Sequence, residues 1–169
     1  KEPNLTQWLD IVALGTVCDV VALKGANRAF VRQGLKVMAQ RRNPGLSALA
    51  DVAGLDEQPG TFHLGFLMGP RVNAGGRIGL SELGTRLLTT EDPAEAMEIA
   101  HRLDGFNAER KEIEAQVLQQ AIDALEVENA NRTTAFVAGK NWHPGVIGIV
   151  ASRLKDRFNR PACVLSIDG

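Results

Sequence analysis

The chain has 169 residues, of which 44% are hydrophobic and 23% are charged, and its formal net charge is −1. This composition excludes a disordered or fibrous chain and suits one domain of ordinary size or parts of two. A charge near zero gives no sign of a nucleic-acid partner, so any basic surface has to be local. No apolar run reaches the ~18 residues of a membrane span. Cys18 and Cys163 lie far apart without metal-ligand spacing, which favours two buried thiols over a disulfide or a zinc site.

The first part of the chain is expected to be mostly helical. Residues 9–21 form an apolar stretch with few polar interruptions, which indicates burial in a larger body. An amphipathic helix is expected from Asn27, as its N-cap, to Gln40, with a stripe that comprises Phe30, Val31, Leu35 and Met38. Shorter helices are expected over 46–52, 61–69 and 81–88, and Ser81 is available to cap the last of them.

Asp19 stands at the end of the apolar stretch over 9–21. A carboxylate among apolar residues is unfavourable unless it is paired, hydrogen-bonded or bound to a metal, and hard divalent cations prefer oxygen ligands. The alternative is an aspartate that caps the next turn, and for a lone residue that alternative is favoured. Asp10 lies nine residues away and need not share a site with it.

A glycine-rich segment follows from Gly69 to Gly79, with four glycines and one proline in eleven residues. This composition predicts a loop. The segment carries Arg71, Asn73 and Arg77, and such side chains bind phosphate where glycines let a ligand approach the backbone. The alternative is a tight crossing whose arginines pair with carboxylates of the helix that follows, and spacing alone leaves the two open.

A long acidic helix is expected next. Asp92 and Pro93 form a strong helix start, and the helical pattern continues to about residue 128, with Gly105 as its one weak point and residues 129–132 as its end. Residues 91–132 carry eleven acidic and four basic residues, whereas the segments before and after each have a net charge of +3. Two basic bodies joined by an acidic helix suit a polyanion, although a solvated acidic helix is the commoner explanation.

The end of the chain is expected to be a strand, a loop, a helix and a second strand. The strand over 135–138 ends at Gly139, and the helix opens near Pro144 and Gly145. Free backbone N–H groups at a helix N-terminus attract anions such as phosphate. His143 in this loop either caps the helix or contacts phosphate, and it has no His or Cys neighbour that would favour zinc.

Three ordered segments together resemble the RecJ exonucleases of the DHH phosphoesterase superfamily. Residues 9–23 resemble the last conserved segment of the DHH domain, residues 69–79 the segment after it, and residues 142–154 the opening of the DHH-associated domain. The resemblance implies an α/β fold with residues 1–90 as the C-terminal part of the DHH domain, 91–132 as a long connecting helix and 133–169 as the start of the associated domain.

The resemblance also implies a function. It indicates a bacterial cytoplasmic exonuclease that removes nucleotides from the 5′ end of single-stranded DNA with Mn²⁺ or Mg²⁺, in DNA repair and recombination, with a single-stranded-DNA-binding protein or a helicase as partner. Asp19 is then a metal ligand, and the DNA contacts are Arg71, Asn73, Arg77, His143 and Gly145. The other metal ligands are absent, so the chain alone is expected to be inactive.

Two other functions stay open. One is a phosphoesterase that acts on short oligonucleotides or cyclic dinucleotides, and the other is a non-catalytic nucleic-acid-binding module. The compact relatives use shorter connections than the long helix expected here, which argues against the first.

Overall fold

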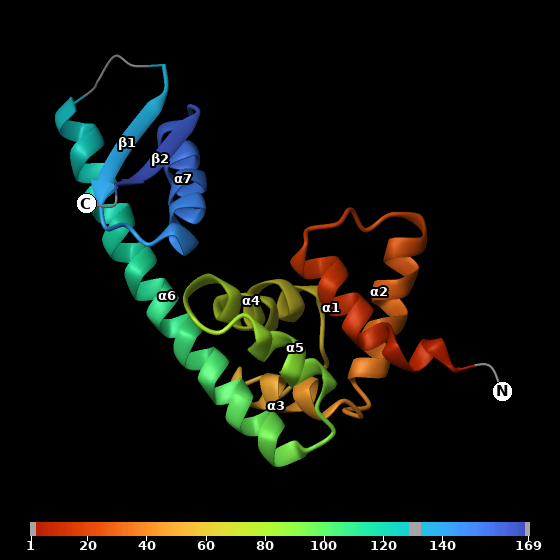
Figure 1. The fold of residues 1–169 in the computed structure, drawn as a ribbon. Coiled ribbons are helices and arrows are strands. Elements are labelled where there is room, and N and C mark those ends of the chain that lie inside the picture. Colours follow the sequence, from red (N-terminus) through yellow and green to blue (C-terminus); the bar gives the residue numbers. More distant parts are fainter. Residues whose placement is uncertain (1–2, 129–132, 168–169) are drawn as a thin grey trace. The chain divides into compact units, whose positions relative to one another are not determined.

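The computed structural model describes residues 3–128 and 133–167, and the chain forms two compact units, Lys1–Asn107 and Ala108–Gly169 (Figure 1). The first unit is helical. The second contains a two-stranded parallel sheet with helices. An α/β fold with a mostly helical first part is therefore confirmed, and the predicted domain limits at residues 90 and 133 stay a prediction.

The first unit is built from short helices that pack around one core. Its elements are the 3-10 helix η1 (Leu5–Trp8), α1 (Leu9–Cys18), α2 (Gly25–Met38), α3 (Pro44–Val52), the π-helix η2 (His63–Met68), α4 (Gly69–Ile78), α5 (Glu82–Thr89) and the first half of α6. The largest fully buried side chains of this core are Leu49, Leu64, Met68, Leu83, Leu87, Ile99 and Leu103.

The prediction of a loop over residues 69–79 is wrong, because α4 spans Gly69–Ile78 and continues directly from the π-helix. The glycines serve close packing here. A Cβ atom on Gly69 would lie 2.4 Å from the Cys18 sulfur of α1, so only glycine lets the two helices approach this closely. The Gly69 N–H donates to Leu64 O, one residue further back than in an α-helix. Tertiary packing thus overrides the poor helix propensity of the segment.

Two predicted caps are also wrong. Helix α2 begins at Gly25, two residues before the predicted cap Asn27, whose side-chain amide instead donates to Ala22 O at 3.3 Å. Ser81 precedes α5 but its side chain makes no capping hydrogen bond. Both helices therefore begin without a side-chain acceptor for their first N–H groups, which the sequence does not reveal.

The predicted burial of the apolar segments is only partly met within the described residues. Ala13 and Leu14 are buried in α1, and Val31 and Met38 are buried in α2. The first unit nevertheless exposes several large apolar side chains, namely Leu5, Trp8, Val12, Val20, Val21, Leu23, Phe30, Phe62 and Phe66.

Helix α6 (Pro93–Glu128) confirms the predicted long helix. Asp92 caps it, since its Oδ1 accepts the Ala94 N–H at 2.9 Å, as the Asp-Pro start predicts. Ile99 and Leu103 enter the core of the first unit, and Val117, Ile122 and Leu125 enter the core of the second. One apolar stripe therefore serves two cores. The predicted end at 129–132 lies outside the described residues.

The second unit contains the predicted strand–helix–strand arrangement. Strand β1 (Ala135–Lys140) pairs in parallel with β2 (Ala162–Ile167), with Val137 opposite Val164, and α7 (Pro144–Phe158) connects them. Val146, Val150 and Leu154 of α7 are fully buried against the sheet and α6. Phe136, Leu165 and Ile167 are exposed on the strands.

Both cysteines are free, which confirms two separate thiols. Cys18 is partly buried, but Cys163 is exposed on β2, so the expectation of two buried thiols is wrong for Cys163. Among the described residues, no helix is long and apolar enough to cross a membrane.

Candidate metal and nucleic-acid site

Asp19 lies at the C-terminal end of α1, where a hydrogen-bonded turn fixes its position. Its own N–H donates to Gly15 O at 3.0 Å. The next two N–H groups also donate to carbonyls of the last turn of α1: Val20 N–H donates to Val17 O and Val21 N–H to Thr16 O, both at 3.1 Å. This pair of bonds is the Schellman motif, which satisfies the last carbonyls of a helix. The Asp19 carboxylate is exposed and is held at a defined helix end.

The residue after Asp19 has a strained backbone. Val20 has φ 56°, the left-handed conformation that this motif requires and that glycine normally supplies. A β-branched residue is a true outlier there, and such strain often collects at functional sites. The Val20 side chain is 88% exposed, so no burial within this unit compensates for the strain.

The described residues around Asp19 do not complete a metal site. No group of three or more His, Cys, Asp or Glu side chains that could hold a metal occurs in the part of the chain that the structure describes. Asp10 is at the opposite end of α1, about 13 Å away at 1.5 Å per residue. The structure therefore agrees that Asp10 and Asp19 need not share a site.

Helix α4 carries the three predicted phosphate contacts on two faces. Arg71 Nε donates to Asp104 Oδ1 of α6 at 2.8 Å, and Arg71 Nη1 donates to Leu67 O at 2.7 Å. This ion pair matches the alternative to phosphate binding that the sequence left open, in which an arginine of the segment pairs with a carboxylate of the long helix. Asn73 and Arg77 are both exposed and lie four residues apart, so they share another face of the helix.

The loop before α7 has a buried tryptophan at its centre. The Trp142 indole N–H donates to Gln120 Oε1 of α6 at 2.7 Å, and the ring packs over Gly139. A Cβ atom on Gly139 would lie 2.0 Å from the ring, so glycine is needed at this position. Trp142 therefore anchors the loop to α6, which sequence reasoning did not predict.

His143 caps α7, as one of its two predicted roles requires. Its Nδ1 accepts the Gly145 N–H at 3.0 Å, so this nitrogen is unprotonated and the other ring nitrogen is the one that can donate. The Gly145 N–H was itself predicted to attract an anion, and it already has this acceptor. An anion at this helix end would have to share the N–H with His143 or use the neighbouring groups.

A charged cluster in the second unit was not predicted. The buried carboxylate of Glu114 accepts hydrogen bonds from Arg110 Nη1 at 2.6 Å and from Arg153 Nε of α7. The spacing of Arg110 and Glu114 is a helical i, i+4 pair and is visible in the sequence. Arg153 joins them only because α7 packs against α6, so no sequence signal identifies it.

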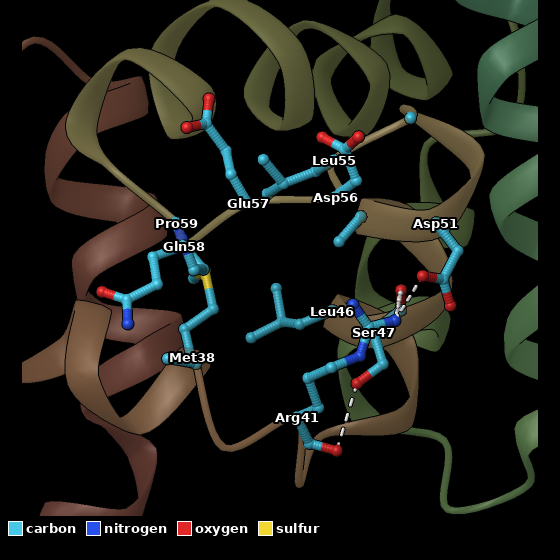
Figure 2. Close-up of a pocket in the computed structure, with 13 residues that line it drawn as sticks. Met38, Arg41, Leu46, Ser47, Asp51, Leu55, Asp56, Glu57, Gln58 and Pro59 are labelled. Carbon is cyan, nitrogen blue, oxygen red and sulfur yellow. Dashed lines mark hydrogen bonds and ion pairs between the residues drawn. The ribbon is translucent and has the colours of Figure 1, made fainter.

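A cavity of about 860 Å³ in the first unit is lined by none of the predicted site residues. Figure 2 shows it between the end of α2, α3 and the segment that leads to the π-helix, with Met38 and Leu46 inside. Arg41 at its rim pairs with Asp51. The remaining charged residues there, Asp56 and Glu57, are acidic and exposed, so the cavity is unsuited to phosphate.

The comparisons with known proteins agree on one group. No protein-family profile matches the chain. Curated single-stranded-DNA-specific exonucleases RecJ match it over 99% of its length, with 41% identity in Dickeya dadantii and in Escherichia coli. The protein of the same name from Thermus thermophilus is 34% identical over 97% of the chain. The chain spans about 30% of the length of the first two relatives.

Solved structures of RecJ proteins match the fold of the chain over nearly its whole length. A crystal structure of exonuclease RecJ bound to manganese has a TM-score of 0.87 and 33% identity, over 97% of this chain and 41% of the other. RecJ from Thermus thermophilus in complex with Mg²⁺ has a TM-score of 0.88 and 32% identity, over 97% of this chain and 26% of the other.

Proposed function

We propose that this chain, which matches RecJ exonucleases over about 30% of their length, forms part of a metal-dependent exonuclease specific for single-stranded DNA. The observation that carries the proposal is the match itself, which covers nearly the whole chain in sequence and in fold. The proposed reaction is phosphodiester hydrolysis from the 5′ end, in DNA repair and recombination.

Asp19 is the proposed metal ligand. A carboxylate suits Mn²⁺ or Mg²⁺, and the relatives of known structure were crystallised with these ions. Its exposure and fixed position at the end of α1 fit that role. A bound metal ion lowers the pKa of water and stabilises charge on the phosphate oxygens. One carboxylate does not hold such an ion tightly, so the remaining ligands have to come from elsewhere in the full-length protein, and the isolated chain is expected to be inactive.

The proposed DNA contacts fall into two groups. Asn73 and Arg77 are exposed on α4, so they can approach a phosphate directly. Arg71 belongs to the same proposal, but its pairing with Asp104 means that it also orients α4. His143 and Gly145 form a second contact at the start of α7, where the helix dipole favours an anion.

The test is cleavage of 5′-labelled single-stranded DNA by the full-length protein with Mn²⁺. Asp19→Asn keeps the size and removes the charge, and we expect it to reduce the rate by about 10²-fold or more, as loss of a metal ligand or of its electrostatic stabilisation does. Asp56→Asn, which also removes one exposed carboxylate of the first unit, is the matched control and should leave the rate unchanged. Unchanged cleavage by Asp19→Asn would remove this residue from the mechanism.

The same assay separates the alternatives. A non-catalytic module would bind single-stranded DNA without any metal-dependent cleavage, and a phosphoesterase for short substrates would cleave dinucleotides but not long strands. The proposal includes the bacterial cytoplasm as the location, because the relatives are bacterial, and a single-stranded-DNA-binding protein or helicase as partner. Co-purification of either with the full-length protein tests the partner.

A further inference from the structure

A second cavity in the first unit, of about 590 Å³, lies at the N-terminal end of α1, whereas Asp19 follows its C-terminal end. It is formed by η1 and the start of α1, the start of α3 and the end of α5. Its volume is within the usual range for small-ligand sites. None of the residues proposed to bind metal or DNA lines it, so any function of this cavity is separate from the proposed nuclease site.

The main polar group of this cavity is the Asp10 side chain, which is only 3% exposed. Its Oδ1 accepts the Ile11 N–H at 2.8 Å, but among the described residues no lysine, arginine or histidine forms an ion pair with it. Burial raises the pKa of Asp10, and two backbone hydrogen bonds offset this only in part. The charged form of a buried carboxylate without a cationic partner is unfavourable, so a cation that reached Asp10 would stabilise it.

The walls of the cavity show which chemistry fits the carboxylate. Trp8 is half exposed and lines the cavity, and the face of a tryptophan ring can bind a cation. Ile11 and Leu88 add apolar wall, and Glu91 adds a second carboxylate. Arg42 is the one basic residue that lines the cavity among the described residues, and it makes no ion pair with Asp10. With two acidic groups and one basic group, the lining has a net charge of −1.

We propose that this cavity binds a cationic side chain, a lysine or an arginine, whose aliphatic stem lies against Trp8, Ile11 and Leu88 and whose nitrogen donates to Asp10. Long basic side chains bury their stems along apolar surface while the charged end finds a carboxylate, and this cavity offers both in one place. Anions and neutral apolar ligands fit less well, because each would leave the Asp10 charge buried and unpaired.

Two sources can supply this side chain. The chain spans about 30% of the length of its relatives, so a basic residue from the rest of the full-length protein is one. A lysine or arginine on a partner protein is the other. The chemistry is the same in both cases, and the full-length protein distinguishes them.

The first experiment titrates this 169-residue chain with n-butylguanidinium, which has the stem and charged end of arginine. The indole N–H signals of Trp8 and Trp142 are followed by NMR, together with the Gln7 side-chain amide as a second reporter in the cavity. We expect a saturable shift of the Trp8 and Gln7 signals and none of Trp142. The Asp10→Asn variant should weaken binding at least about tenfold, since hydrogen bonds to charged groups are worth that much.

Three controls make this result specific. Asp56→Asn removes an exposed carboxylate elsewhere in the unit and should not change binding, and Arg42→Gln removes a competing cation and should tighten it. Trp8→Ala, at a half-exposed position, should weaken binding as read by Gln7, and it serves as the test if Asp10→Asn does not fold. Absence of a saturable shift, or equal binding by Asp10→Asn and the unchanged chain, would overturn the proposal.

The second experiment repeats the titration with the full-length protein. If its own basic residue fills the cavity, the probe should not bind and Asp10→Asn should destabilise the full-length protein but not the isolated chain. If a partner supplies the side chain, the probe should bind both proteins equally. A full-length protein that neither binds the probe nor loses stability with Asp10→Asn would contradict both sources. DNA cleavage by the Asp10→Asn variant is a separate measurement, so failure here leaves the nuclease proposal intact.

Discussion

Replacement of Val20 by glycine is expected to stabilise the isolated chain, although valine-to-glycine changes usually do the opposite. Val20 adopts φ 56° in the turn that follows Asp19. This conformation costs an L-residue about 1–2 kcal/mol, and glycine adopts it without strain. Glycine gains about 0.5–1 kcal/mol of freedom in the unfolded chain, which opposes the effect. The side chain is 88% exposed, so little burial is lost. The net gain should be about 0.5–1 kcal/mol.

The assay is urea unfolding of the chain, followed by circular dichroism, with the midpoint and slope fitted for each variant. Val21→Gly is the matched control, because Val21 is adjacent, partly exposed and not in the left-handed region. It should lose about 1 kcal/mol or more, since glycine adds unfolded-state entropy there and removes a side chain that is only 41% exposed. If Val20→Gly lowers stability as much as Val21→Gly, the strain that we assign to the turn beside Asp19 does not exist.

Three further predictions concern buried charged groups and thiols. Glu114→Gln should cost about 3 kcal/mol or more, because it removes the buried charge that both Arg110 and Arg153 contact. Arg153→Gln should cost less than about 1 kcal/mol, because Arg153 is 58% exposed, and equal losses in urea unfolding would contradict this. Iodoacetamide at pH 8 should modify the exposed Cys163 well before Cys18, since burial raises the pKa of Cys18 to about 11. Equal labelling of the two cysteines in peptide mass mapping would contradict this prediction and show that Cys18 is accessible. Asp10→Asn should stabilise the isolated chain at pH 7, because burial raises the pKa of Asp10 and its charged form therefore costs folding stability above that pKa. The gain should disappear as the pH falls towards about 4, the ordinary pKa of aspartate, because the carboxyl of the folded chain is then already protonated. A gain that does not depend on pH would rule out this origin.

Local signals in the sequence predicted the parts of the fold that depend on neighbouring residues. The Asp92–Pro93 start of α6 and its apolar stripe are such signals, because capping and helical periodicity act within a few residues. The order of strand, loop, helix and strand at the end of the chain was visible for the same reason.

The glycine-rich segment could not be predicted, because its structure depends on distant residues. Its glycines look like loop formers until Cys18 of α1 is seen to lie against Gly69. The role of Arg71 was likewise undecided in the sequence, since Asp104 is 33 residues away and only the packing of α4 on α6 brings them together.

The candidate site was predictable only in part. The sequence gives both roles of His143, and the structure adds that its Nδ1 already caps α7. Asp19 was proposed as a metal ligand from a resemblance, and the residues that the structure describes contain no group of three or more His, Cys, Asp or Glu side chains that could hold a metal with it. Glu114 with its two arginines was missed, because a carboxylate on a long acidic helix looks solvated until its burial is known.

The central claim is that Asp19 holds a divalent metal ion in a single-strand-specific exonuclease. The most direct measurement is Mn²⁺ binding to the full-length protein, followed by electron paramagnetic resonance of the free ion, for the unchanged protein and for Asp19→Asn and Asp56→Asn. We expect Asp19→Asn alone to weaken Mn²⁺ binding by at least about tenfold, since even the loss of a group that only supports a metal ligand costs about that much. Equal binding by all three proteins would contradict the assignment of Asp19 as a metal ligand.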